Sequence, residues 1–105
     1  MENSTQAFNW DTFRKNLKVL RKHYKITQEE IAEKIGISRS SYQYAEAKSA
    51  TGVIMEAIAF WNNNYGISPN DILMSELNPK KIQNIETRIR FEKMNKRVKV
   101  TIKKK

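Results

Sequence analysis

The sequence predicts an all-α fold in which five short helices form one domain and a basic extension follows it. Two observations support this prediction. Apolar residues recur at intervals of three and four through most of the chain, which is the spacing of one helix face. The few glycines and prolines fall near the ends of these segments, where they can stop or start helices. We therefore expect an N-terminal arm over residues 1–9, a helical domain over residues 10–77 and a C-terminal extension over residues 78–105.

The first helix is expected over residues 10–24, with either Asn9 or Asp11 as its N-cap. The apolar residues that follow a helical period along it are Phe13, Leu17, Leu20 and Tyr24. One apolar face predicts that this helix packs against a core.

The second helix is expected to begin at a capping box and to end at a glycine. In residues 27–30, the Thr27 hydroxyl can accept a hydrogen bond from the N–H of Glu30 while the Glu30 carboxylate reaches back to Thr27. Gly36 can adopt the left-handed conformation that follows a helix. Only a short turn separates this helix from the next, for which Ser38 is the expected N-cap.

The third helix is expected to extend to about Glu46 and to have two unlike faces. Tyr42 and Ala45 would face the core. The opposite face is polar or aromatic and carries Arg39, Ser40, Gln43 and Tyr44. Such a face can contact a partner, although it is also the ordinary surface of a solvated helix.

Two more helices complete the domain. The fourth is expected from Thr51 or Gly52 to about residue 64, and Pro69 at the first helical position predicts a short fifth helix. Aromatic residues gather near the end of the fourth helix, either as core residues or as an exposed patch: Phe60, Trp61 and Tyr65.

The extension combines a helical pattern with an alternating one. Ile82, Ile85 and Ile89 recur at helical spacing and predict a sixth helix. Residues 98–102 alternate apolar and polar side chains, which is typical of a short strand with one apolar face.

The positive charge of the chain is confined to its last quarter. The formal net charge is +9, yet residues 1–79 carry as many acidic as basic side chains. Residues 80–105 hold the excess, with Glu86 and Glu92 as their only acids. A segment of this kind attracts polyanions, and nucleic acid is the usual one in a cell. Three roles stay open for it: contact with a nucleic-acid backbone, a structured role such as dimerisation, or a partly ordered solvated tail.

The composition argues against an enzyme. Cys is absent and His23 is the only histidine, so the chain offers neither a thiolate nucleophile nor the ligands of a zinc site. The sequence also lacks a glycine-rich phosphate loop. We therefore predict a protein that is not an enzyme and that uses neither a metal nor a cofactor.

Nothing in the sequence predicts a membrane protein. The chain contains no apolar run near the roughly 20 residues that span a bilayer. Its N-terminus lacks the basic start and apolar stretch of a signal peptide. We expect a cytoplasmic protein with no membrane contact.

Residues 17–73 resemble the phage-repressor and Cro-like helix-turn-helix family, also called the XRE type. The similarity lies in residues 17–21, in residues 26–42, in Glu46 and in the closing residues 66–73. It implies a five-helix, lambda-repressor-like DNA-binding domain over residues 10–77. In such a domain the third helix lies in the major groove of DNA while the second braces on the backbone. Lys48 departs from the family, which usually has a glycine there.

The resemblance also implies roles for individual side chains. Gln28 would contact a phosphate at the start of the second helix. Arg39 could pair with guanine and Gln43 with adenine. The complete set of DNA contacts expected on this basis is Gln28, Ser38, Arg39, Ser40, Gln43, Tyr44 and Lys48.

Arg21 and Glu46 match a structural pair of related repressors, in which an arginine late in the first helix meets a glutamate that ends the third. We expect this ion pair to be half buried and to tie the two helices together.

The function predicted from the sequence is a sequence-specific transcriptional regulator, most simply a repressor, that binds double-stranded DNA as a homodimer. The alternative is an antitoxin-like or adaptor protein whose residues 80–105 bind a protein partner.

Overall fold

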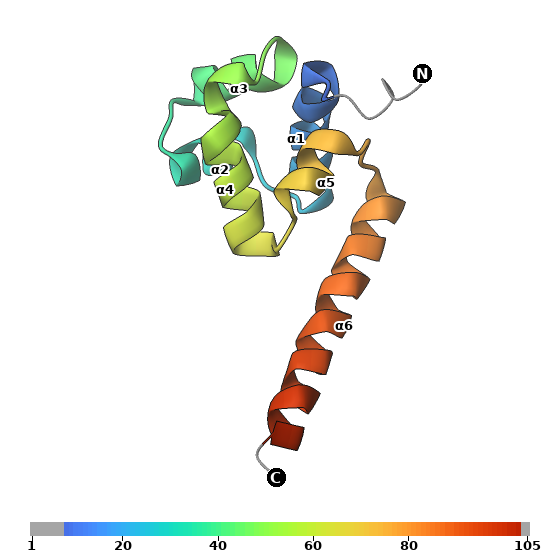
Figure 1. Ribbon diagram of the computed structural model, residues 1–105. Helices are drawn as coiled ribbons and strands as arrows, with labels where there is room; N and C mark the ends of the chain where they lie inside the picture. The colour runs from blue at the N-terminus through green and yellow to red at the C-terminus, as the bar shows by residue number, and fades with distance from the viewer. Residues whose placement is uncertain (1–7, 104–105) are drawn as a thin grey trace, which may run out of the picture.

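A computed structural model describes residues 8–103, and it describes side chains as far as residue 95. Every regular element within these residues is helical, which confirms the all-α prediction (Figure 1). The elements are α1 (Trp10–His23), α2 (Gln28–Ile35), α3 (Arg39–Ala47), the 3-10 turn η2 (Thr51–Val53), α4 (Ile54–Tyr65), α5 (Pro69–Met74) and α6 (Pro79–Lys103).

The helix ends follow the capping signals of the sequence. The Asn9 side chain, rather than that of Asp11, caps α1 by accepting from two backbone N–H groups. Thr27 and Glu30 form the complete capping box of α2. Gly36 follows α2 with a φ of 82°, a conformation that L side chains rarely adopt, so glycine is needed there. These contacts fix where α2 begins and ends.

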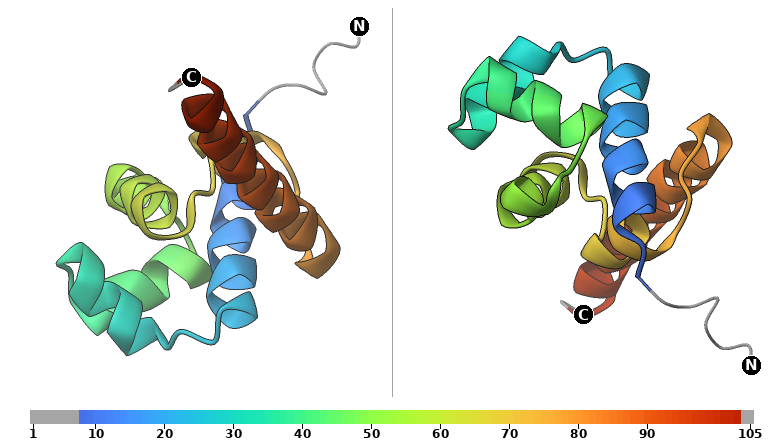
Figure 2. Two further views of the ribbon diagram at one scale, coloured as in Figure 1. Left: turned by 90° about the horizontal axis from the view of Figure 1, so that it is seen from below. Right: turned by 90° about the horizontal axis from the view of Figure 1, so that it is seen from above.

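Helix α1 occupies the middle of the molecule. It contacts α3, α5 and α6, whereas α2 packs against α3 and α4. Both views of Figure 2 place α1 between α3 and α6. Helices α3 and α6 therefore lie on different sides of α1.

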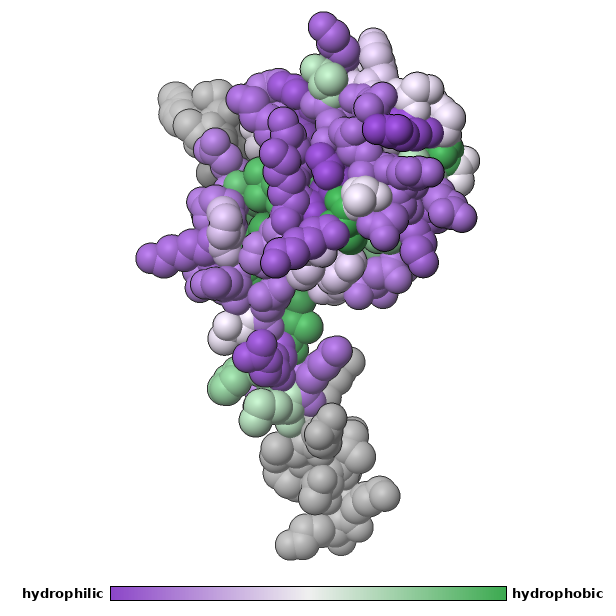
Figure 3. All heavy atoms as spheres, turned by 180° about the vertical axis from the view of Figure 1, so that it is seen from behind, coloured by the Kyte–Doolittle hydropathy of each residue, from purple (hydrophilic) through white to green (hydrophobic). Residues whose placement is uncertain are grey.

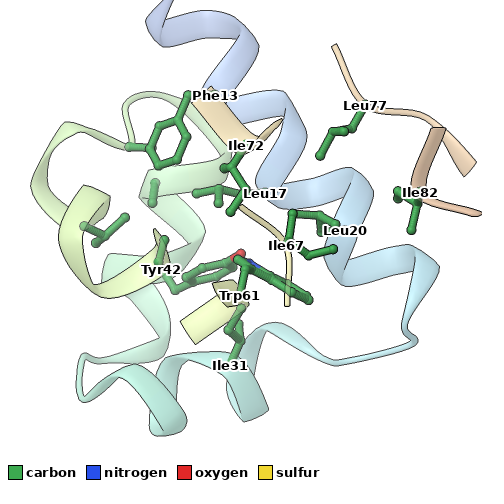
Figure 4. Packing of buried hydrophobic residues seen from close by; sticks show 14 of the residues in the cluster. Phe13, Leu17, Leu20, Ile31, Tyr42, Trp61, Ile67, Ile72, Leu77 and Ile82 are labelled. Carbon is green, nitrogen blue, oxygen red and sulfur yellow. The ribbon is translucent and has the colours of Figure 1, made fainter. Parts of the chain in front are cut away.

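The core forms around Trp61, which is fully buried. Figure 4 shows its ring among the side chains of Tyr42, Ile31 and Leu20, which come from three different helices. Trp61 is thus a core residue, while its aromatic neighbours Phe60 and Tyr65 are only partly buried against the cluster. The other fully buried apolar residues include Phe13, Leu17, Ile67, Ile72 and Ile82.

Asn16 is a polar side chain buried inside the domain. Its amide nitrogen donates to the carbonyl oxygens of Ile72 at 2.7 Å and Ser75 at 2.6 Å, and its oxygen accepts from the N–H of Leu77 at 2.9 Å. These bonds satisfy backbone groups at the end of α5 and in the segment before α6. Asn16 therefore fastens α5 and the start of α6 to α1.

Helix α6 starts as part of the domain core. Ile82 and Ile85 are buried in the same cluster as α1 and α4. Two polar contacts add to this packing: the Tyr24 hydroxyl donates to Glu86 at 2.6 Å, and Arg88 pairs with Asp71 at 2.9 Å. The expected extension therefore has its first turns docked on the domain.

The prediction of a short strand over residues 98–102 is wrong, because α6 continues through these residues to Lys103. The alternation there is compatible with a helix that is already nucleated by its docked first half, since adding residues to an existing helix costs far less than starting one. Among the described residues no helix is both long and apolar enough to cross a membrane.

Candidate nucleic-acid interface

Helices α2 and α3 are joined by a turn of three residues, 36–38, and pack directly on each other. The N–H of Ile37 donates to the carbonyl of Ala32 at 3.0 Å, which closes the end of α2. Ala32 is buried, and its small side chain lets the two helices approach. This is the arrangement of a helix-turn-helix, in which a short turn sets two helices at a large angle.

The two faces of α3 are as unlike as the sequence predicts. Tyr42 and Ala45 are buried against the core. The four outward residues are all exposed, with Tyr44 at 59 % of its surface: Arg39, Ser40, Gln43 and Tyr44. A single face of α3 therefore offers a guanidinium, a hydroxyl, an amide and a phenol to a partner.

Ser38 has a structural task that its exposure does not reveal. Its hydroxyl oxygen accepts from the N–H of Ser41 at 3.1 Å and so caps α3. The same hydroxyl donates to the Ser41 side chain at 2.9 Å. Ser38 holds the first turn of α3 in place, and its contact with DNA stays a prediction.

Arg21 and Glu46 form a two-pronged ion pair between α1 and α3. The Arg21 Nε lies 2.6 Å from one Glu46 carboxylate oxygen, and Nη2 lies 3.0 Å from the other. Only 13 % of the Arg21 side chain and 4 % of the Glu46 side chain are exposed. Burial raises the pKa of Glu46, but hydrogen bonds led by that from Arg21 outweigh this effect and hold the pKa below its ordinary value. The carboxylate therefore stays charged in the folded protein.

Gln28 joins this ion pair to the start of α2. Its amide nitrogen donates to Glu46 at 3.1 Å. An amide nitrogen carries two hydrogens, so a second donor position is left for a phosphate oxygen. The Arg21–Glu46 pair thus sets the position of the side chain that was predicted to contact the DNA backbone.

Two further features near the end of α3 were not predicted from the sequence. Arg14 donates to the Glu46 carbonyl oxygen at 2.6 Å, which satisfies a backbone acceptor near the end of α3. Lys48 is the C-cap of α3 with a φ of −126°. Because this is not a left-handed conformation, Lys48 can stand where related proteins have a glycine.

A polar hollow of about 560 Å³ lies between α1 and the starts of α2 and α3. It brings Gln28 and Arg39 together with two lysines of α1 that the sequence reasoning missed, Lys18 and Lys22. Both lysines are exposed. Their spacing of four residues puts them on one face of α1, a signal that the sequence did contain. The hollow is also lined by Arg21, which is paired with Glu46, and by the Glu29 carboxylate, so its cations outnumber its one acid. This lining suits an anionic ligand such as a phosphate.

Two more of the predicted contacts lie beside a second hollow, whereas Ser38, Gln43 and Lys48 line neither of the two. Ser40 and Tyr44 line a space of about 440 Å³ together with Ser49 and Gly52. Hydroxyl groups around such a space can donate to phosphate oxygens. Within the described residues no group of three or more His, Cys, Asp or Glu side chains could hold a metal ion.

Comparison with known protein families gives one match. A family model described as a helix-turn-helix domain matches residues 15–77. The matched range includes the whole of α2 and α3 and both members of the Arg21–Glu46 pair. Comparisons with curated proteins and with solved structures found no match.

Proposed function

This chain belongs to the helix-turn-helix domain family, and we propose on that basis that it is a sequence-specific transcriptional regulator that represses by occupying DNA. The observation that carries the proposal is the family match across residues 15–77 together with the exposed polar face of α3 inside that range. In this motif the second of the two helices, which is α3 here, enters the major groove.

Base recognition is assigned to the outward face of α3. Gln43 can bond both the N6 and the N7 of an adenine, and Arg39 can reach the O6 and N7 of a guanine. Arg39 also lines the polar hollow with Lys18 and Lys22, so a phosphate is the competing ligand for its guanidinium. Ser40 and Tyr44 supply further donors on the same face.

Backbone contacts are assigned to residues around α3. Gln28, Lys18 and Lys22 surround one hollow and would hold a phosphate on one side of the groove. Lys48 follows α3 and is exposed where the opposite strand could lie. Such contacts set the position of the domain on the duplex and carry no sequence information themselves.

A homodimer completes the proposal. Helix-turn-helix dimers bind two half-sites whose centres lie about one helical turn apart, so a dimer should select a site with two-fold symmetry.

Selection of binding sites from a random pool of duplex DNA with the full-length protein tests this function. We expect a two-fold symmetric site with half-sites about 10 base pairs apart. Binding to the selected site should then be compared with binding to a scrambled duplex at two salt concentrations. If no motif emerges and both duplexes bind alike with a steep salt dependence, α3 does not read bases and the proposed function is wrong.

A further inference from the structure

The two halves of α6 present apolar residues on opposite sides. Ile82, Ile85 and Ile89 face the domain and pack on its core. Phe91 and Met94 are 62 % and 56 % exposed. Phe91 follows Ile82 by nine residues, which is about two and a half helical turns and so places it roughly opposite on the helix.

Phe91 and Met94 are three residues apart and so lie on the same side of α6. We call Phe91 and Met94 the distal stripe. In the coloured part of α6 that projects from the domain, Figure 3 shows apolar surface among polar surface.

The second half of α6 has little support from its own domain. Among the described residues, Ile89 is the last one of α6 that packs against the core cluster. The 14 residues from Arg90 to Lys103 then continue as helix beyond it. An isolated helix of that length is marginal in water, and an apolar stripe on it adds an unfavourable exposed surface. Packing of the distal stripe against another surface would remove both costs.

The chain itself carries a surface that fits this stripe. A groove of about 460 Å³ lies between α2 and α4, with Ile26, Phe60 and Tyr65 among its lining residues. Glu30 and Glu33 also line it. We call this the α2–α4 groove. Its lining contains none of the residues predicted to contact DNA, so an occupant leaves those side chains free.

Charge favours this groove over a second distal stripe as the partner. Arg90 precedes Met94 by four residues and so flanks the stripe, and six of the ten residues after position 95 are lysine or arginine. Two such helices side by side would bring cations against cations, which is unfavourable. The α2–α4 groove is also lined by two lysines, Lys25 and Lys34, whose charges Glu30 and Glu33 balance. The groove is therefore neutral and does not repel a cationic helix.

We propose that the distal stripe of α6 docks in the α2–α4 groove of a second copy of this chain. Reciprocal docking gives a two-fold dimer in which each copy contributes one stripe and one groove. Association in this way needs no DNA, although its use in presenting two α3 helices rests on the proposed function. The dimer would also give the projecting half of α6 the tertiary packing that it lacks in one copy.

The first test is the mass of the DNA-free, full-length protein in solution, measured by sedimentation over a range of concentrations. The wild type should change from monomer to dimer. The double variant Phe91→Ser and Met94→Ser should weaken association by roughly a hundredfold, because two large apolar side chains no longer become buried. Met55→Ser is the matched control, since Met55 is 74 % exposed on α4 and does not line the groove. A wild type that stays monomeric, or a double variant that dimerises like it, overturns the proposal.

A charge exchange identifies the groove. Arg90→Glu and Glu33→Lys should each weaken self-association, by roughly two- to fivefold, and a mixture of the two variants should recover part of the loss. If Arg90→Glu alone has an effect, two distal stripes pair with each other or with another partner and the groove is not the docking site. Far-UV circular dichroism of each variant confirms that the domain is folded.

These outcomes separate the dimer from the regulator. If the protein dimerises but selects no DNA motif, the docking inference stands and the proposed function is wrong. If the protein is monomeric but selects a motif, the docking inference is wrong and the proposed function stands.

Discussion

Helices α3 and α6 differ in both charge and position. The outer face of α3 carries one cation, Arg39, among neutral polar side chains. Residues 80–105, most of which form α6, carry the whole net charge of the chain. The two helices lie on opposite sides of α1, and α6 extends away from α3 (Figure 1).

This difference separates two contributions to DNA binding that are often combined. Positive charge gives affinity that is indifferent to sequence and sensitive to salt. Hydrogen-bonding side chains on a correctly placed helix give sequence discrimination. The net charge of +9 therefore does not mark the proposed reading surface, which lies on a domain with balanced charge.

The largest expected effect concerns the ion pair that holds α3 in place. Arg21→Met leaves the Glu46 carboxylate buried without its main partner, and should cost roughly 3–5 kcal/mol of unfolding free energy. Urea denaturation measures this loss. The double variant Arg21→Met with Glu46→Leu is the control, because it removes the unpaired charge and should recover much of the stability. A single variant that loses less than about 1 kcal/mol would mean that the pair does not position α3.

The same pair predicts a pH dependence. The pKa of Glu46 is held below its ordinary value of 4.5 in the folded protein. The stability that this carboxylate contributes is therefore present above that ordinary value and is lost as the pH falls through the folded pKa. Wild-type protein should lose stability on acidification below about pH 5, and Glu46→Gln should show a flatter profile. Equal slopes in urea melts at several pH values would assign the acid sensitivity to other carboxyl groups.

A smaller effect is expected on the opposite side of α1. Asn16→Ala removes three hydrogen bonds and leaves the carbonyls of Ile72 and Ser75 and the N–H of Leu77 without this partner. The cost should be about 1–3 kcal/mol of stability. Sequence discrimination by the folded protein should not change, because Asn16 supports α5 and α6 rather than α3. Loss of discrimination without loss of stability would contradict this division of roles.

The third effect is on DNA binding alone. Arg39→Ala should weaken binding to the selected site by about 1–3 kcal/mol while leaving the urea midpoint unchanged. Lys81→Ala, at an exposed position near the start of α6, is the control and should change affinity much less. If the two variants lose affinity equally, charge on either helix serves the same purpose and the contrast between α3 and α6 fails.

The smallest expected effect is on the salt dependence of binding. Replacing both Lys18 and Lys22 by Gln should lower the slope of log K against log salt by up to about two units, one for each phosphate that a lysine no longer neutralises. Replacing Lys80 and Lys81, which are exposed at the start of α6, should leave the slope unchanged. Fluorescence anisotropy at several salt concentrations measures both, and the reverse result would move the backbone contacts to α6.

Local signals in the sequence were enough for much of this structure. The capping box at Thr27, the cap at Ser38 and the glycine at position 36 each act over three or four residues, and all three lie where they were expected. The pairing of Arg21 with Glu46 was expected from the family resemblance rather than from spacing, and the structure has it.

Features that depend on distant segments were not predictable in the same way. Asn16 looks like an ordinary polar residue of α1, because the carbonyls that it bonds come 56 and 59 residues later. Residues 98–102 alternate like a strand, yet their conformation follows from a helix that begins at Pro79. The burial of Ile82 and Ile85 beyond the expected end of the domain likewise depends on how α6 packs on α1. The DNA contacts themselves stay predictions.

The most direct test of the central claim is a set of binding measurements with wild-type protein and Gln43→Ala. Each protein should be measured on the selected site and on variants of that site with one base pair changed at a time. If α3 reads bases, Gln43→Ala loses discrimination at one position of each half-site, by about 1–3 kcal/mol, and keeps it elsewhere. A uniform loss of affinity on every duplex, with discrimination unchanged, would contradict base reading by α3.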